Sequence, residues 1–248
     1  MNTKDIKEQA KKAYKFDLKR NAGVEFISFA VKSAAIFTLI TVYIICLTKL
    51  GSLAATIPAA LILLALYAVI YLFVIAPVNL GRNLYFSKVA SNLQPATDEM
   101  FHFYRRLPSA IYAYFRIAIA MVFYTVFFVA LTIVYFRIYF LFSTNWFTPV
   151  NFILCAAIIV LYALCIIVTR LKYAPLPVVY HKHSPMTSIV FVAKTLRFSQ
   201  GIKMGLFKLY LSFAGWYILG VLSFGIGFIW IMPYIRIASG IYLNEVID

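Results

Sequence analysis

The stretch I-A-I-A-M-V-F-Y-T-V-F-F-V-A-L-T-I-V-Y-F, residues 117–136, decides the fold class, because it is an uncharged run between Arg116 and Arg137. At about 1.5 Å per residue, a helix of this length covers about 30 Å, the thickness of the hydrocarbon core of a bilayer. We therefore predict a transmembrane helix over residues 117–137. The two arginines should lie at head-group level, one on each side of the membrane.

The composition of the whole chain agrees with this prediction. The 248 residues are 64% hydrophobic and 12% charged, whereas soluble domains are about 45–50% apolar and about 25% charged. These values exclude a soluble globular protein, a disordered chain and a coiled coil. The expected fold is an all-α, polytopic integral membrane helical bundle forming one compact domain.

Further apolar runs flank the first one along the chain, at residues 24–48, 53–76, 150–169, 204–222 and 226–243. We predict six transmembrane helices within a single bundle over residues 24–248. The last two runs leave an alternative, in which one helix continues to Trp230 and an external amphipathic tail follows, which makes five. Gly220, Gly225 and Gly227 favour a tight turn at Ser223–Phe224–Gly225 and therefore six helices.

The first 23 residues form a separate, strongly charged segment. Ile6, Ala10, Tyr14 and Leu18 recur at helical spacing, and lysines fill most other positions. We predict an amphipathic helix over residues 3–22 that ends at Asn21 and Gly23 and lies in the cytoplasmic interface, with its lysines toward anionic head groups. A solvated charged helix without a lipid role is the alternative.

Two longer segments, residues 77–117 and 170–205, are predicted to lie in the cytoplasm. In the first, Pro77 and Gly81 are expected to end the second transmembrane helix, and Thr97 to cap a short amphipathic piece that runs to Leu107.

The second cytoplasmic segment begins where the fourth transmembrane helix is expected to stop, at Arg170. Pro175, Pro177 and Pro185 should break the chain early, and residues 188–198 should then be helical. The outer turn before that fourth helix is expected at Asn145, Trp146 and Pro149.

The charge distribution predicts the orientation in the membrane. The net charge is +15, and of the 23 Lys and Arg residues all but Lys49, Arg137 and Arg236 fall in segments predicted to be cytoplasmic. Because positive residues are retained on the cytoplasmic side, the N-terminus is expected inside. No cleavable signal is recognisable, so the first transmembrane helix should act as the insertion signal.

The scarcity of acidic residues limits the chemistry. No Asp or Glu lies between Glu25 and Asp98, or between Glu99 and Glu245. We therefore expect no carboxylate at membrane depth for coupled transport, acid–base catalysis or metal binding, and we predict a protein that is not an enzyme and uses no cofactor. The cluster His181–Lys182–His183 is interpreted as a solvated loop rather than a metal site.

We predict that the protein does not bind nucleic acid. Aromatic and basic residues interleave over residues 101–116, but aromatic belts at a membrane boundary explain that pattern, and no reader motif is present. The expected partners are membrane lipids with anionic head groups at the cytoplasmic face and a membrane protein.

Arg236 is the residue of greatest functional interest. If residues 226–243 span the membrane, Arg236 lies about 15 Å deep, where a charge is costly. With no acid expected nearby, its partners would be carbonyls, one of them freed by Pro233, or a lipid phosphate or an anionic ligand. Alternatively, the chain bends at Pro233 and Arg236 reaches the interface. Lys32 and Lys203 are the other candidate contacts for an anion or lipid.

Small and ring-bearing residues of the last helices are candidates for close helix packing and turns. They are Gly215, Trp216, Gly220, Gly225, Gly227 and Pro233.

The sequence S-Q-G-I-K-M-G-L-F-K-L-Y-L-S-F-A-G-W-Y-I-L-G-V-L-S-F-G-I-G-F-I-W-I-M-P-Y, residues 199–234, resembles the bacterial membrane family known as domain of unknown function 975. Pro77, Gly81 and Tyr242 also resemble family positions. The positions that match the family within the quoted stretch are Ser199, Gly201, Lys203, Phe207, Ser212, Phe213, Gly215, Trp216, Gly225, Gly227, Trp230, Pro233 and Tyr234.

One departure from the family pattern concerns the end of the fourth helix. Where the family usually has Pro-Gly, this chain has R-L-K-Y-A-P over residues 170–175. The resemblance implies a multi-pass helical protein in a bacterial plasma membrane, with no settled activity.

Three functions remain open. The first is a non-catalytic accessory or scaffold component of an export or envelope complex, for which changes at Phe101, Arg105, Lys194 or Arg197 should matter most. The second is a carrier or permease-like subunit for an anionic or lipid substrate, which Arg236→Leu should inactivate. The third, a membrane-bound enzyme, has the least support because acids are missing.

Overall fold

A computed structural model describes residues 2–50, 53–142, 149–183 and 187–247, and all regular elements within these ranges are helical. The elements are α1 (Thr3–Phe16), α2 (Leu18–Leu50), α3 (Leu53–Ile70), the π-helical η1 (Tyr71–Ile75), α4 (Ala76–Ala90), the 3-10 helix η2 (Thr97–Tyr104), α5 (Leu107–Phe142), α6 (Pro149–Tyr173), α7 (Leu176–His183), α8 (Ser188–Phe198), α9 (Lys203–Leu211), α10 (Ala214–Leu222) and α11 (Phe228–Ile247).

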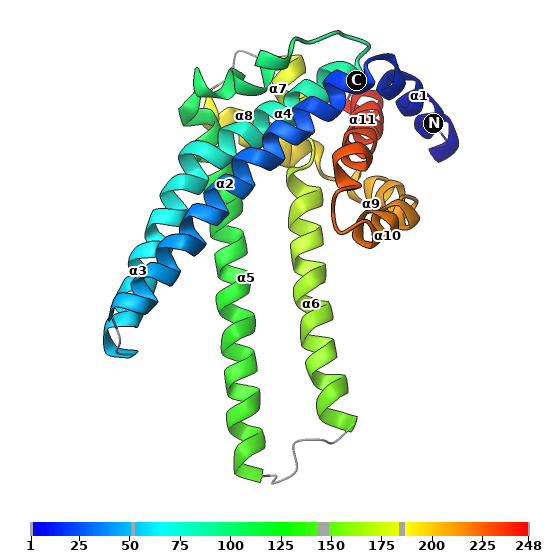
Figure 1. Ribbon diagram of the computed structural model, residues 1–248. Coiled ribbons are helices and arrows are strands. Elements are labelled where there is room, and N and C mark those ends of the chain that lie inside the picture. Colours follow the sequence, from blue (N-terminus) through cyan, green and yellow to red (C-terminus); the bar gives the residue numbers. More distant parts are fainter. Residues whose placement is uncertain (1, 51–52, 143–148, 184–186, 248) are drawn as a thin grey trace.

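The molecule consists of a helical head and two long helical hairpins (Figure 1). The head comprises α1, α4, η2, α7, α8 and α11. One hairpin is formed by α2 and α3, the other by α5 and α6, and both extend from the head in the same direction while diverging from each other. Helix α1 and the end of α11 both lie at the head.

Four stretches are long and apolar enough to cross a membrane: Leu18–Ile45, Ala65–Ala90, Leu107–Arg137 and Ile153–His183. A fifth exists if α9 and α10, which meet at a bend of 48°, are taken as one broken span. The chain is thus an all-helical membrane protein with four or five candidate spans. We predicted six. Among the described residues α11 is not a candidate, and the run at 204–222 counts only if α9 and α10 form one span.

The candidate spans contribute little to the protein interior. In each span we consider one apolar stretch of 18 residues. None of these residues is buried in Leu107–Arg137, and 6% are buried in Leu18–Ile45 and in Ile153–His183. In Ala65–Ala90 the buried share is 39%. Exposed apolar side chains such as Val122, Phe123 and Val126 cover α5. Most of the apolar surface of the two hairpins is therefore left uncovered by the rest of the described protein.

The hydrophobic core lies in the head. Helix α4 is at its centre and contacts η2, α7 and α11. Large, fully buried side chains of α4, η2, α8 and α11, and of α9 beside the head, make up this core: Leu80, Leu84, Tyr85, Phe86, Met100, Phe103, Phe191, Leu206, Leu209 and Ile237. The segments predicted to be cytoplasmic thus pack together with α9 and α11, which we had predicted to cross the membrane.

The first helix ends earlier than predicted, because Asp17 and not Asn21 or Gly23 marks the break. Asp17 has non-helical dihedral angles (φ −141°, ψ 67°). Its carboxylate accepts a hydrogen bond from the backbone N–H of Arg20 at 3.2 Å, as an N-cap of α2 does. Asn21 and Gly23 lie inside α2, where the Asn21 side chain bonds the Tyr14 carbonyl (3.1 Å) and the Tyr85 hydroxyl (3.1 Å).

Pro77 and Gly81 do not end the second span, contrary to our prediction. The chain stays helical from α3 through η1 into α4 as far as Ala90. Pro77 lies in the first turn of α4, directly after the wide turn of η1, where its missing N–H removes little. The Val74 carbonyl within η1 accepts a hydrogen bond from the Tyr104 hydroxyl at 3.1 Å.

Gly81 serves a close crossing of two backbones. A Cβ atom at this position would overlap the carbonyl oxygen of Met100 and lie 2.6 Å from its carbonyl carbon. Only glycine therefore lets η2 pack onto α4. We expected Thr97 to cap this segment, but the N-cap residue is Ala96.

Helices α5 and α6 are longer than the spans read from the sequence. The 36 residues of α5 correspond to about 54 Å, so Arg116 and Arg137 lie within the helix and not at its ends. Helix α6 continues past Arg170 and ends at Tyr173. Arg170 and Lys172 lie in its last turn, where positive charge is favourable because of the helix dipole. Helix α8 spans residues 188–198, as predicted.

Some expectations for this region fall elsewhere. The outer turn was predicted at Asn145, Trp146 and Pro149. Asn145 and Trp146 lie outside the described residues, as does Pro185, and Pro149 begins α6. The run at 204–222 is not one helix but breaks between α9 and α10 at Ser212 and Phe213.

A turn joins α10 to α11 at residues 223–227, where the sequence indicated one. Phe224 and Gly225 both have positive φ (52° and 86°), which explains the glycine. The Ser223 hydroxyl donates to the Gly220 carbonyl (2.8 Å) and accepts from the Gly227 N–H (2.9 Å), which closes the turn. Phe224 at its tip is 98% exposed.

Candidate functional site

A row of polar side chains on α2 forms one side of the candidate site. Asn21, Glu25, Ser28 and Lys32 follow one another at spacings of four, three and four residues, which places them on one helix face. Asn21, Glu25 and Ser28 are buried, and Lys32 is half-buried. A buried polar face at the start of an apolar helix requires polar partners on the neighbouring helices.

Arg82 of α4 is the first partner. Its Nη1 donates to Oε1 of Glu25 at 2.8 Å and to the Ser28 hydroxyl at 3.0 Å. The side chains of Arg82 and Glu25 are only 6% and 9% exposed. The ion pair is therefore part of the protein interior, where the loss of one partner leaves an uncompensated charge.

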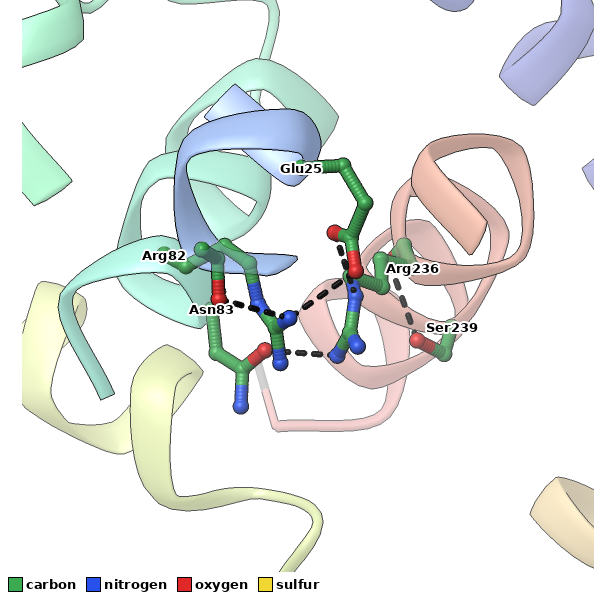
Figure 2. A network of polar contacts seen from close by, with 6 residues as sticks. Glu25, Arg82, Asn83, Arg236 and Ser239 are labelled. Carbon is green, nitrogen blue, oxygen red and sulfur yellow. Dashed lines mark hydrogen bonds and ion pairs between the residues drawn. The ribbon is translucent and has the colours of Figure 1, made fainter. Parts of the chain in front are cut away.

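Arg236 of α11 is the second partner of the same carboxylate (Figure 2). Its Nε donates to Oε2 of Glu25 at 3.2 Å, and its Nη1 donates to Oδ1 of Asn83 on α4 at 2.7 Å. Ser239, one turn later, donates to the Arg236 carbonyl at 2.9 Å. One carboxylate thus joins two guanidinium groups from α4 and α11, and with them three helices that are distant in sequence.

The surroundings add further positive charge. Lys32 interacts electrostatically with Arg82, Arg236 and Arg170 as well as with Glu25. Arg82 likewise interacts with Arg170. We call Glu25, Lys32, Arg82, Arg170 and Arg236 the arginine cluster. Within it, Arg82 and Glu25 are buried, Lys32 and Arg236 are half-buried, and Arg170 is exposed.

The arginine cluster corrects one expectation. We expected Arg236 to bind carbonyls, a lipid phosphate or an anionic ligand for lack of an acid, whereas Glu25 is its partner across 211 residues. Glu25 is buried near the start of the candidate span Leu18–Ile45. Pro233 is buried in α11, which stays helical on both sides of it.

The other candidates for anion contact have different places. Lys32 belongs to the arginine cluster. Lys203 begins α9 and is half-buried there.

The packing candidates of the last helices divide into two groups. A Cβ atom on Gly220 would meet the Phe228 ring, and one on Gly227 the Ser223 hydroxyl, so both allow the close approach of α10 and α11. A Cβ atom on Gly215 or Gly225 would meet nothing within 4 Å. The Trp216 ring lies 6.2 Å from the Tyr234 ring and is 46% exposed.

Groups of three or more His, Cys, Asp or Glu side chains that could hold a metal ion are absent from the described residues. We interpreted His181–Lys182–His183 as a solvated loop, but these residues form the last turn of α7 and are half-buried. The arrangement therefore offers charge and hydrogen-bond donors for an anion, and it does not offer a metal-binding set of ligands.

The whole chain was compared with models of known protein families. Residues 1–248, the whole chain, match the family model described as "Protein of unknown function (DUF975)". The chain belongs to this family. No curated protein and no solved structure matches it.

Two positions of the family resemblance have a structural role here. Gly81 allows the backbone crossing at Met100, and Gly205 faces Tyr242, whose hydroxyl a Cβ atom on the glycine would overlap. Both pairs hold elements of the head region together. The residues at 170–175, where the chain departs from the family pattern, continue α6 for one more turn and then lead into α7.

Sequence reasoning missed Glu25, Arg82 and Asn83 as members of the site. A signal was available, because Asn21, Glu25, Ser28 and Lys32 have the spacing of a helix face. The predicted helix end at Asn21 and Gly23 concealed it.

Proposed function

We propose that this DUF975 protein is a non-catalytic integral membrane protein of the bacterial plasma membrane that serves as an accessory or scaffold component of an export or envelope complex. The observation that carries the proposal is the contrast between a well-packed head and nearly unburied spans. A carrier needs a packed bundle around a binding site near the middle of the membrane. Helices that present apolar surface instead suit association with other membrane helices.

The proposed orientation has the head in the cytoplasm. Most basic residues lie in the head, including its helix α1, and in the segments that join its helices, which favours the cytoplasmic side. The apolar side of α1 contributes the buried residues Ile6 and Ala10 to the head, and its lysines suit contact with anionic head groups. Helix α1 and the end of α11 both lie at the head (Figure 1), so the proposal has them on the same side of the membrane.

The head offers exposed side chains for a partner. Phe101 of η2 is 43% exposed and lies 6.2 Å from Tyr104, ring to ring. Arg105 follows η2 directly, and Arg197 is exposed on α8. Exposed aromatic and arginine residues are the types that dominate the binding energy of interfaces.

A carrier for an anionic or lipid substrate remains the second candidate, favoured by the arginine cluster. The two functions predict different variants. Under the accessory function, Phe101→Ala combined with Arg105→Gln should weaken association with the partner about tenfold or more, the usual effect of losing interface anchors. Under the carrier function, Arg236→Leu should abolish transport, whereas the head variant should not.

Native mass spectrometry of the gently extracted, tagged chain shows which protein partner remains bound to the wild type and to each variant. We expect a stoichiometric partner, identified by its fragments as an export or envelope component, in the wild type and in Arg236→Lys. The head variant should lose it. A partner that persists in the head variant but is lost in Arg236→Lys contradicts the proposed role of the head.

A further inference from the structure

We propose that the arginine cluster binds a phosphate-type anion, which the exposed edge of Arg236 and the half-buried Lys32 admit. This site is independent of the accessory function, because it concerns the interior junction of α2, α4 and α11 and not the surface of the head. The free anion and the phosphodiester of a lipid head group share the chemistry in question.

The first argument is the charge balance. Glu25 forms ion pairs with both Arg82, which is buried, and Arg236, so its single negative charge compensates one of these two positive charges. Elsewhere in the described residues, Asp17 pairs with Arg20, and Glu99 pairs with Lys88 (2.8 Å), so these two acids are used. Buried like charges are costly unless a counter-charge is present. An anion supplies it.

The second argument is unused hydrogen-bonding capacity. The side chain of Arg82 is only 6% exposed, and its buried Nε has no hydrogen-bond partner among the described residues. A guanidinium group carries five N–H donors in a planar fork that matches two oxygens of a phosphate. In Figure 2 the guanidinium groups of Arg82 and Arg236 lie next to each other, below the Glu25 carboxylate, and each has a nitrogen without a drawn contact.

The third argument is access from the membrane surface. Arg82 is enclosed, but the side chain of Arg236 is 25% exposed. Glu25 lies seven residues after the start of α2 at Leu18, about 10 Å along the helix, which is near the level at which the span enters the head groups. Lipid phosphates lie at that level, and so do dissolved anions.

Thermal stability of the detergent-purified full chain tests the site, because a ligand that binds the folded protein raises its melting temperature. Two ligand pairs are compared: sodium phosphate against sodium chloride at equal ionic strength, and phosphatidylglycerol against phosphatidylcholine. The variants are Arg236→Gln and Lys32→Gln. The matched control is Arg197→Gln, which removes the same charge from an exposed position on α8.

We expect phosphate to raise the melting temperature of the wild type more than chloride does, or phosphatidylglycerol to raise it more than phosphatidylcholine does, or both. The dissociation constant should rise about tenfold in Arg236→Gln, the usual effect of a lost charge-assisted hydrogen bond. Arg197→Gln should keep the wild-type constant. Stabilisation by phosphatidylglycerol alone identifies a lipid head group, and stabilisation by phosphate identifies a free anion.

Two results overturn the proposal. One is that neither phosphate nor phosphatidylglycerol exceeds its control ligand with the wild type. The other is that binding is unchanged in both Arg236→Gln and Lys32→Gln. Because Lys32 is half-buried and takes no part in the ion pairs of Glu25 with Arg82 and Arg236, its variant carries the test if Arg236→Gln does not fold.

Discussion

Glu25→Gln is expected to destabilise the protein by about 3–5 kcal/mol, the range found when one partner of a buried ion pair is removed. The change keeps the shape of the side chain and removes its charge. Arg82 and Arg236 would then face each other without a counter-ion at the junction of α2, α4 and α11. Both guanidinium groups would also lose a charge-assisted hydrogen bond.

The measurement is the melting temperature of purified protein in detergent, with Glu8→Gln as the control. Glu8 is exposed on α1, so its variant changes the net charge equally and should melt like the wild type. The double variant Glu25→Gln/Arg236→Gln should be less destabilised than the sum of the two single changes, because the residues are in contact. Equal melting of Glu25→Gln and wild type would show that the ion pairs contribute nothing.

Gly81→Ala is the second change with a large expected effect, a loss of about 3 kcal/mol or more, which is the upper range for overpacking. The added methyl group would overlap the carbonyl oxygen of Met100, and neither atom belongs to a flexible side chain. Helix η2 would have to move away from α4. Met100 and Phe103, both fully buried, would move with it.

Gly215→Ala is the matched control for this change. Gly215 also lies in a helix, but a Cβ atom there meets nothing within 4 Å. Alanine is the better helix former, so this variant should melt at the wild-type temperature or slightly above it. If Gly81→Ala melts like Gly215→Ala, the close crossing of α4 and η2 does not exist in solution.

The sequence was informative about elements whose signal is local. The uncharged run between Arg116 and Arg137 identified a span, because length and hydropathy are sufficient to decide what crosses a bilayer. The turn near Gly225 was recognisable because a positive φ favours glycine. Helix lengths were less predictable, since a helix such as α5 continues beyond the apolar run once it leaves the lipid.

The interpretation of Pro77 and Gly81 failed for a tertiary reason. Both residue types usually end a helix, yet here a wide π-helical turn precedes the proline, and the glycine accommodates a crossing backbone. Neither feature can be derived from the residues alone. The family resemblance did mark both positions as special, and the structure supplies the reason for Gly81.

The arginine cluster was beyond local reasoning as well. Glu25 and Arg236 are 211 residues apart, and their pairing depends on how α11 packs on α2 and α4. The conclusion that Arg236 lacks an acidic partner followed from sequence distance, which is no guide to spatial distance. The spacing of Asn21, Glu25, Ser28 and Lys32 would have indicated a polar helix face toward the protein interior.

The central claim, that the exposed spans associate with helices of another membrane protein, is tested most directly by photocrosslinking in native membranes. Val126 of α5 is 62% exposed, and a photoreactive residue is placed at this position. The matched position is Thr125, whose hydroxyl lies 3.0 Å from that of Tyr162 on α6. We predict adducts within the chain from Thr125, and from Val126 an adduct with an identified export or envelope protein. Adducts with lipid alone at Val126 would contradict the account.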